Sequence, residues 1–234
     1  FLSRMVRGLP WVRMKMAASL DGTTALSNGA SQWITAEAAR TDGHAWRKRA
    51  GAILTGIGTV LEDDPRLDVR LVETARQPLR VVVDSRLEIP LDARIIAPPG
   101  QLLVATAADP QASADKRAAL AELGVTVIDC PGPARPGLHA KVDLPSLLQQ
   151  LARRGVNELH VEAGHKLNGS LLREGLVDEL LLYLAPRLLG PGMRLANIGP
   201  LTELSQGIEL EYVEASPVGR DLRIRARMPG RDRF

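Results

Sequence analysis

The sequence predicts an α/β protein with a mixed, mostly parallel sheet flanked by helices and an antiparallel hairpin at its carboxyl end. Short apolar and β-branched runs, such as residues 79–84, alternate with short helical segments, a pattern typical of parallel sheets covered on both faces. The last two alternating segments, 208–215 and 221–228, flank a turn containing proline and glycine, which indicates a hairpin. With 234 residues, 45% of them hydrophobic, the chain has enough material for one core. We therefore expect a single domain over residues 11–230.

The amino-terminal part begins with a lead-in and a strand. Residues 1–10 are basic and start without an initiator Met, so we interpret them as an irregular lead-in cut from a longer chain. Residues 11–19 alternate apolar and basic side chains before turning apolar, which predicts a strand with Lys15 in its middle. Thr35 is a candidate N-cap for a helix that reaches about Arg49.

The next segment suggests a phosphate-binding turn. An apolar strand at 52–56 leads through Gly56 and Gly58 into a brief helix, which ends near Asp63 because the residue before Pro65 avoids the helical region. Backbone N–H groups and the helix dipole at such a start favour a phosphate. The third glycine of the dinucleotide fingerprint is Leu61 here, so a tight turn without a ligand explains the pattern equally well.

The remaining elements continue the alternation. Asp143 is expected to cap a leucine-rich helix that Gly155 ends. The strand at 158–162 leads into a glycine-containing loop at 163–170 and a short helix to Glu174. Proline-rich residues 131–137 are expected to form a surface connection. Further strands are expected at 102–106, 125–129 and 179–184, and a further helix at 113–123.

Composition and motifs exclude several functional classes. The 30 basic and 27 acidic residues are spread along the chain and aromatic residues are few, which argues against a nucleic-acid partner. The single cysteine, Cys130, cannot form an intrachain disulfide. With no signal peptide or long apolar span, we expect a cytoplasmic protein without a membrane partner. The four histidines are scattered and no metal, serine-elbow or Walker motif occurs, so no metal site is expected and His160 is interpreted as a hydrogen-bonded core residue.

The chemistry that the sequence permits is hydride transfer. A reductase needs a nucleotide cradle, an anion site and a group that manages one proton, because the cofactor performs the hydride chemistry itself. Ligands of parallel sheets bind beyond the carboxyl ends of the strands. Glycine turns and arginines near the predicted strand ends fit these needs. Lys15, Asp63 and Glu162 are the titratable candidates for moving the proton or orienting a ribose, and the sequence does not rank them.

Four motifs in order resemble the reductase domain of the bifunctional riboflavin-biosynthesis deaminase/reductase. They are Met-Lys-Met-Ala-Ala-Ser-Leu-Asp-Gly at 14–22, Ser-Gln-Trp-Ile-Thr at 31–35, Ile-Leu-Thr-Gly-Ile-Gly-Thr-Val-Leu-Glu-Asp-Asp-Pro at 53–65, and Val-Glu-Ala-Gly at 161–164. The resemblance implies a dihydrofolate-reductase-like fold and NADPH-dependent reduction of 5-amino-6-(5-phosphoribosylamino)uracil to the ribitylamino product. It also implies a homodimer and, in the intact protein, fusion to a zinc deaminase domain, whose H-x-E and P-C-x-x-C motifs are not in this sequence. Residues 1–10 resemble the interdomain linker that follows that deaminase domain, so the resemblance implies a linker remnant there.

The resemblance also implies site residues. Cofactor positions fall on Ala17, Trp33, Thr59, Asp63, Ser85, Gly164, His165, Lys166, Leu167, Asn168, Gly169 and Ser170. Substrate positions fall on Ser31, Arg47, Leu67, Arg70 and Glu162. Ala17 stands where the family often has glycine, a small change that should leave backbone approach intact. Position 75, where an acidic ribose ligand would follow the Gly56 turn, is Ala75, which favours NADPH over NADH.

Two other functions fit the same residues. One is a dihydrofolate-reductase-like reductase of another diaminopyrimidine or a pterin. The other is a non-catalytic nucleotide-binding module. A turnover assay distinguishes the three. Turnover with the phosphoribosylaminouracil supports the first function, turnover only with another pyrimidine or a pterin supports the second, and binding without turnover supports the third.

Overall fold

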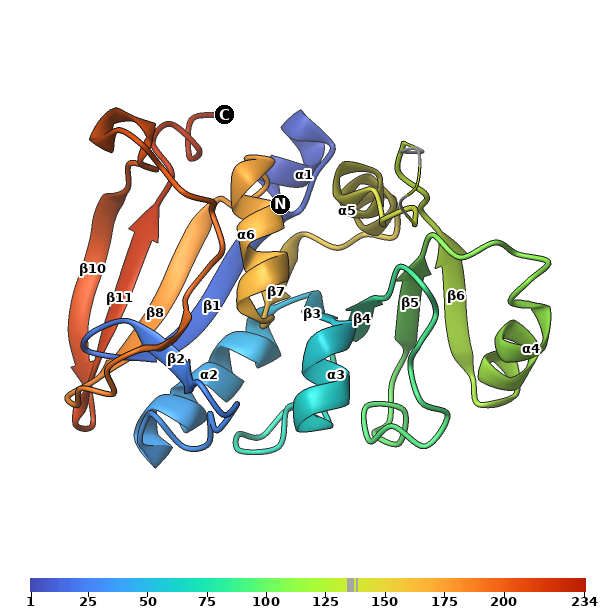
Figure 1. The fold of residues 1–234 in the computed structure, drawn as a ribbon, viewed down its shortest axis with the longest axis horizontal. Coiled ribbons are helices and arrows are strands. Elements are labelled where there is room, and N and C mark those ends of the chain that lie inside the picture. Colours follow the sequence, from blue (N-terminus) through green and yellow to red (C-terminus); the bar gives the residue numbers. More distant parts are fainter. Residues whose placement is uncertain (134–136, 138) are drawn as a thin grey trace. The chain divides into compact units, whose positions relative to one another are not determined.

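The computed structural model describes residues 1–133, 137 and 139–234 (Figure 1). The middle of the predicted surface connection at 131–137 lies outside the described residues. The chain divides into two compact units, one made of Phe1–Pro10 and Arg47–Leu159, the other of Trp11–Trp46 and His160–Phe234. The expected single domain over residues 11–230 stays a prediction.

The first unit contains a parallel sheet in the order β3-β4-β5-β6. Its strands are β3 (Ala52–Gly56), β4 (Leu79–Val83), β5 (Leu102–Thr106) and β6 (Val125–Asp129). Its helices are α1 (Leu2–Arg7), α3 (Ile57–Asp63), α4 (Ala114–Glu122) and α5 (Leu144–Arg153). Every residue of β5 is buried. This agrees with the sequence analysis, in which continuous apolar runs predicted strands covered on both faces. The core of this unit lies around Ile53, Val82 and Val104.

Local signals in the sequence explain the ends of these helices. Asp143 caps α5 by accepting a hydrogen bond from the Ser146 N–H at 3.2 Å, as predicted. Asp64 follows α3 with left-handed dihedrals, φ 40° and ψ 59°, which agrees with the exclusion of the residue before proline from the helical region.

One prediction for the first unit was wrong. Residues 1–10 are not irregular, because 2–7 form α1. Their leucine, arginine and methionine residues are good helix formers, and Gly8, at φ 69°, ends the helix by donating its N–H to the Arg4 carbonyl. The Ser3 hydroxyl also donates to the Leu9 carbonyl at 2.8 Å.

The second unit contains a mixed sheet in the order β10-β11-β8-β1. β1 and β8 are parallel, and β11 runs antiparallel to both β8 and β10, so the predicted carboxyl-terminal hairpin is confirmed. The strands are β1 (Trp11–Ser19), β8 (Glu179–Ala185), β10 (Glu211–Val218) and β11 (Asp221–Arg227), with β2 (Thr23–Leu26) and β9 (Gly192–Arg194) in a separate pair. The helices are α6 (His165–Arg173) and the 3₁₀ helix η1 (Leu204–Gln206).

Two elements continue from one unit into the other along the chain. α2 (Glu37–Arg49) belongs to the second unit up to Trp46, and β7 (Glu158–Val161) belongs to it from His160 onward. α2 begins at Glu37, so Ala36 and not the expected cap Thr35 directly precedes it. The Ala36 N–H donates to the Asp221 carboxylate at 2.7 Å. Within the described residues, every helix is too short or too polar to cross a bilayer.

The alternation along β1 gives its sheet two chemically different faces. Lys15 and Ala17 point to one face and Met14 and Met16 to the other, because successive side chains of a strand alternate. The Lys15 face carries α2: a Cβ built on Gly43 of α2 would lie 4.0 Å from Lys15 Cε. The Met16 face is apolar.

Candidate active site

The second unit brings together Lys15 and Glu162, two of the three titratable candidates that the sequence left unranked. Lys15 Nζ lies 4.0 Å from Glu162 Oε2, and the two side chains are 23% and 14% exposed. Glu162 directly follows β7, at a strand end. At this distance the attraction is mainly coulombic rather than a short hydrogen bond. A cation and a carboxylate with limited exposure can serve as proton donor and acceptor at one place.

His160 lies behind this pair. It is fully buried, and its Nε2 atom lies 3.3 Å from Glu162 Oε1. His160 and Glu162 are two residues apart on an extended segment, so their side chains share one face. The burial of His160 agrees with its interpretation as a core residue, whereas the hydrogen bond expected for it stays a prediction. Its contact restrains the Glu162 carboxylate.

Tyr183 and Asp42 complete the surroundings of Lys15, and the sequence analysis missed both. The Lys15 ammonium lies 5.8 Å from the centre of the Tyr183 ring. The buried Tyr183 hydroxyl donates to Asp42 Oδ2 at 2.6 Å, and Arg223 donates to both Asp42 oxygens. Burial, followed by the hydrogen bond and charge of Asp42, raises the pKa of Tyr183 far above its ordinary value. The phenol therefore stays protonated and acts as a fixed donor.

Three other predicted residues of the second unit have surroundings of their own. Ala17 packs, partly buried, against Leu181 and Tyr183. Trp33 is 61% exposed and stacks against the Arg40 guanidinium, 4.6 Å from its ring centre. Ser31 is half-buried in the loop before α2.

The predicted loop at Gly164–Ser170 is wrong, because this stretch forms the start of α6. Gly164 is the extended N-cap, and the helix runs from His165 to Arg173. A Cβ on Gly169 would lie 2.0 Å from the Asn197 carbonyl oxygen. Glycine at 169 therefore serves helix packing rather than loop flexibility.

The same packing distinguishes the predicted cofactor residues of this helix from one another. Asn168 is buried and donates from Nδ2 to the Leu195 carbonyl at 3.0 Å. The N–H of Asn197 donates to the His165 carbonyl at 2.9 Å. Gly164 and Lys166 are exposed, and Leu167 and Ser170 are half-buried. The accessible part of the predicted group is thus the first turn of α6.

In the first unit, Thr59 and Asp63 lie one helical turn apart on α3. Thr59 is half-buried and Asp63 exposed, and side chains four residues apart on a helix are neighbours. Ser85 follows β4, and its hydroxyl accepts the Val142 N–H at 3.1 Å. Asp84 beside it is buried, and this burial raises the pKa of its carboxyl group.

The first unit also brings Arg47 and Arg70 together, around Asp68. The Arg47 guanidinium donates to the Asp68 carbonyl at 2.9 Å, and that of Arg70 to the Asp68 carboxylate at 2.6 Å. Leu67 has its side chain in the apolar core and a left-handed backbone with φ 51°. It can meet a ligand only through its main chain.

Arg66 and Asp68 were missed by the sequence analysis, although a signal existed. Charged residues occupy positions 66, 68 and 70, a period of two that places side chains of an extended segment on one side. Arg66 Nε donates to the Asp68 carboxylate at 2.9 Å. In the part of the chain that the structure describes, no cluster of three or more His, Cys, Asp or Glu side chains could hold a metal ion.

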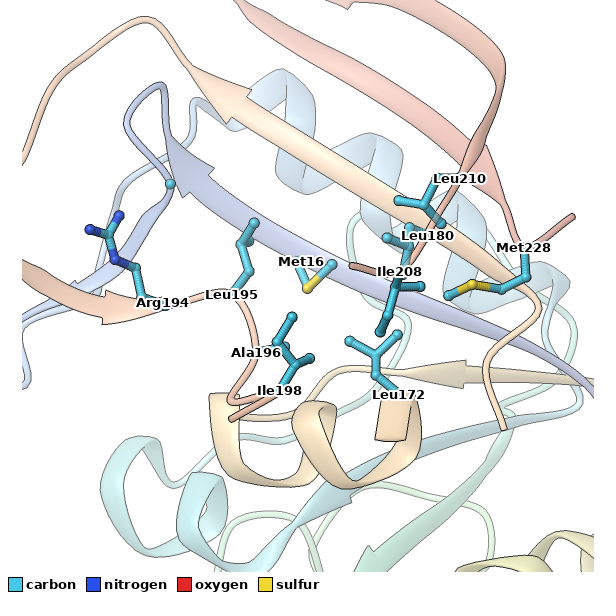
Figure 2. Close-up of a pocket in the computed structure, with 11 residues that line it drawn as sticks. Met16, Leu172, Leu180, Arg194, Leu195, Ala196, Ile198, Ile208, Leu210 and Met228 are labelled. Carbon is cyan, nitrogen blue, oxygen red and sulfur yellow. The ribbon is translucent and has the colours of Figure 1, made fainter. Parts of the chain in front are cut away.

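The second unit contains a cavity of about 350 Å³ on the Met16 face, away from Lys15. Figure 2 shows Met16 of β1 and Leu172 of α6 pointing into it. Leucine, isoleucine and methionine side chains dominate its lining, and among the lining residues that the structure describes Arg194 is the charged one. These described residues include no acid–base pair like that of the opposite face, so we assign the candidate chemistry to Lys15 and Glu162 instead.

Comparison with known proteins places these residues in a family context. The family described as the RibD C-terminal domain matches residues 10–224. The riboflavin biosynthesis protein RibD of Escherichia coli is 39% identical over 95% of this chain and 61% of its own length. That of Chlamydia muridarum is 43% identical over 81% of this chain and 50% of its own length. A solved structure of Acinetobacter baumannii RibD has 35% identity and a TM-score of 0.81, covering 97% of this chain and 60% of its own. The chain thus spans half to three fifths of these relatives.

Proposed function

Because the chain belongs to the RibD C-terminal domain family, we propose that it catalyses the NADPH-dependent reduction of 5-amino-6-(5-phosphoribosylamino)uracil to its ribitylamino product. The observation that carries the proposal is the contact between Lys15 and Glu162 beyond the end of β7. The named relatives from Escherichia coli and Chlamydia muridarum are riboflavin biosynthesis proteins, which supports the same pathway for this chain.

The start of α3 fits a phosphate-bearing cofactor. Gly56 caps this helix in an extended conformation, and a Cβ built on Gly58 would meet no atom within 4 Å. Packing therefore does not require glycine at 58, whereas a side chain would occupy the open space over the first turn. Thr59 adds a hydroxyl there. When bound, NADPH supplies the hydride that reduces C1′ of the substrate.

Residues of the chain hold the substrate and manage its proton. The ribosylamine opens to an imine-like form, and reduction leaves a C1′–H bond and a nitrogen that has taken up one proton. Lys15 holds that proton, and Glu162 orients the opened ribose by accepting from its hydroxyls. His160 restrains Glu162. In the first unit, Arg47 and Arg70 bind the 5-phosphate through charge-assisted hydrogen bonds.

Two partners are also proposed. The first is a zinc deaminase activity that supplies the substrate, on the same polypeptide or another. The second is another copy of this chain. β10 is at the end of the strand order, Tyr212 on it is 81% exposed and Val213 lies beside it, and an open sheet edge with apolar side chains needs covering.

Turnover measurements test the proposed function. Purified protein is mixed with NADPH and the phosphoribosylaminouracil, cofactor absorbance is followed, and the ribitylamino product is identified by mass. Turnover with this substrate supports the proposal. Turnover only with dihydrofolate, a pterin or another diaminopyrimidine would replace it with a related reductase. Cofactor binding without turnover of any of them would indicate a nucleotide-binding module.

A further inference from the structure

Asp68 lies at the centre of three arginines in the first unit. Its buried carboxylate accepts hydrogen bonds from Arg66 Nε at 2.9 Å and from Arg70 Nη1 at 2.6 Å. Its carbonyl oxygen accepts a third from Arg47 Nη1 at 2.9 Å. One residue thus orients guanidinium groups from the end of α2 and from the segment after α3.

The segment that carries Asp68 is itself held firmly. Leu67 has φ 51° with a buried side chain, and a left-handed leucine persists only where its surroundings fix it. The Val69 N–H donates to Gln77 Oε1 at 2.8 Å, and Gln77 Nε2 donates back to the Val69 carbonyl at 2.9 Å. The Asp68 carboxylate is therefore presented at a defined position.

The resulting cluster is strongly cationic. The Arg66 and Arg70 guanidinium groups pair with one carboxylate, and that of Arg47 binds the main-chain carbonyl of the same residue. The Arg66 and Arg70 side chains are 44% and 46% exposed. Burial raises the pKa of Asp68, but hydrogen bonds from Arg70 and Arg66 outweigh it and lower the pKa below its ordinary value. The carboxylate stays ionised at neutral pH, so both ion pairs persist. Each guanidinium has five N–H donors, more than Asp68 engages.

We propose that Asp68 is a positioning residue that sets Arg47, Arg66 and Arg70 as one anion-binding cluster, and that Arg66 is a third arm on the substrate's phosphate. A phosphate has three terminal oxygens, and arginine binds such groups with specific geometry. The identity of the anion as the substrate's phosphate rests on the proposed function, whereas the arrangement of the arginines around Asp68 is independent of it.

The substitution Asp68→Asn separates positioning from simple electrostatics. It removes a negative charge, so charge alone predicts tighter binding of an anion. Positioning predicts the opposite, because an asparagine side chain cannot accept from both arginines in the same way and the guanidinium groups lose their orientation. Asp68→Glu keeps the charge and should restore part of the affinity.

The matched control is the ion pair of Arg117 with Asp129, also in the first unit and also 2.6 Å long. Asp129→Asn and Arg117→Gln remove the same groups far from position 68 in sequence. For each variant we would measure KM and kcat with the phosphorylated substrate, NADPH affinity, Tm, and binding of inorganic phosphate and ribose 5-phosphate by calorimetry.

We expect Asp68→Asn and Arg66→Gln each to raise KM about tenfold and weaken ribose 5-phosphate binding similarly, as loss of a charge-assisted hydrogen bond does. NADPH affinity and kcat should change little, and both controls should match the wild type. Unchanged or tighter ribose 5-phosphate binding by Asp68→Asn would overturn the positioning role, and unchanged binding by Arg66→Gln would remove the third arm. If Asp68→Asn unfolds, Arg66→Gln and Asp68→Glu decide the question.

The calorimetry keeps this inference distinct from the proposed function. Wild-type protein that reduces the substrate while Asp68→Asn keeps its KM refutes the positioning role alone. If the wild type turns over no phosphoribosylaminouracil, but Asp68→Asn and Arg66→Gln each bind ribose 5-phosphate more weakly than the wild type does, the proposed reaction is refuted and the anion-binding cluster is supported. Wild-type protein that binds neither phosphate probe refutes the cluster.

Discussion

The Tyr183 hydroxyl of β8 donates a 2.6 Å hydrogen bond to the Asp42 carboxylate of α2, a residue 141 positions away in sequence. Arg223 of β11 holds the same carboxylate through both oxygens at 3.1 and 3.0 Å. The arrangement fixes the aromatic ring beneath Lys15. A helix and two strands are thus joined at one partly buried acid.

Tyr183→Phe should destabilise the protein by about 1–2 kcal/mol, because it deletes this partly buried hydrogen bond and leaves Asp42 paired with Arg223. Urea unfolding measures the change. The control is Arg117→Gln, which removes a side chain paired with Asp129 in the first unit and should unfold like the wild type. Equal midpoints for the two variants would show that the hydrogen bond contributes nothing.

Glu162→Gln should fold normally and lower kcat at least tenfold, because a hydrogen bond to a charged acceptor is worth roughly 1.5–3 kcal/mol and matters most as C1′ changes geometry. Steady-state kinetics and a melting curve test this. Asp63→Asn, at the exposed end of α3, should mainly weaken NADPH binding instead. Unchanged kcat and Tm in Glu162→Gln would leave Lys15 as the remaining proton candidate.

NADPH should be preferred to NADH. Ser85 follows β4, and Arg86 beside it pairs with Glu88 at 2.9 Å, where its cation could meet a 2′-phosphate. Arg86→Gln should lower the ratio of kcat/KM with NADPH to kcat/KM with NADH by about tenfold. Arg117→Gln should leave this ratio unchanged. Equal kcat/KM values for NADPH and NADH in the wild type would refute the preference.

Acid should destabilise the carboxyl-terminal hairpin through Glu214. Its hydrogen bonds from Arg223 and Ser216 lower its pKa from 4.5 to about 2. A depressed folded-state pKa means that this stabilisation is complete above the ordinary value and disappears as the pH falls from 4.5 toward 2. The Tm difference between wild type and Glu214→Gln should therefore shrink over this range. A pH-independent difference would contradict it.

The protein should be a homodimer that depends on β10. Light scattering at micromolar concentration should give twice the chain mass, and Val213→Lys should lower that mass by placing a charge on the exposed strand. Asp129→Asn is a control away from this strand. A monomeric wild type would refute the prediction.

Local patterns predicted most of the fold. The β-branched run at β4 and the Asp143 cap of α5 depend on neighbouring residues, so the sequence alone identifies them. The start of α6 does not: Gly169 suggests a loop, but glycine is required there by the Asn197 main chain, which approaches from a distant segment. Propensity could not reveal that contact.

The candidate site was predictable to a similar extent. The choice of titratable side chains gave Lys15 as a candidate, and the motif resemblance gave Glu162; the structure brings the two within 4.0 Å. The resemblance also selected Leu67, whose side chain is in the core. Asp42 escaped notice because its role depends on a tertiary partner, Tyr183. Periodicity assigns a residue to a face of its element, but it does not identify the residue that the face will meet.

Lys15 and Met16 point to opposite faces of the sheet because they are neighbours on β1. The number of residues in this strand is therefore more strictly constrained than the identity of its side chains. Loss or gain of a single residue upstream of Lys15 within the paired region would exchange the two faces, turning the ammonium toward the apolar cavity and a methionine toward Glu162. Evolutionary drift can therefore replace side chains along β1 while their parity is kept. Insertions and deletions in this lineage should be confined to the connecting loops.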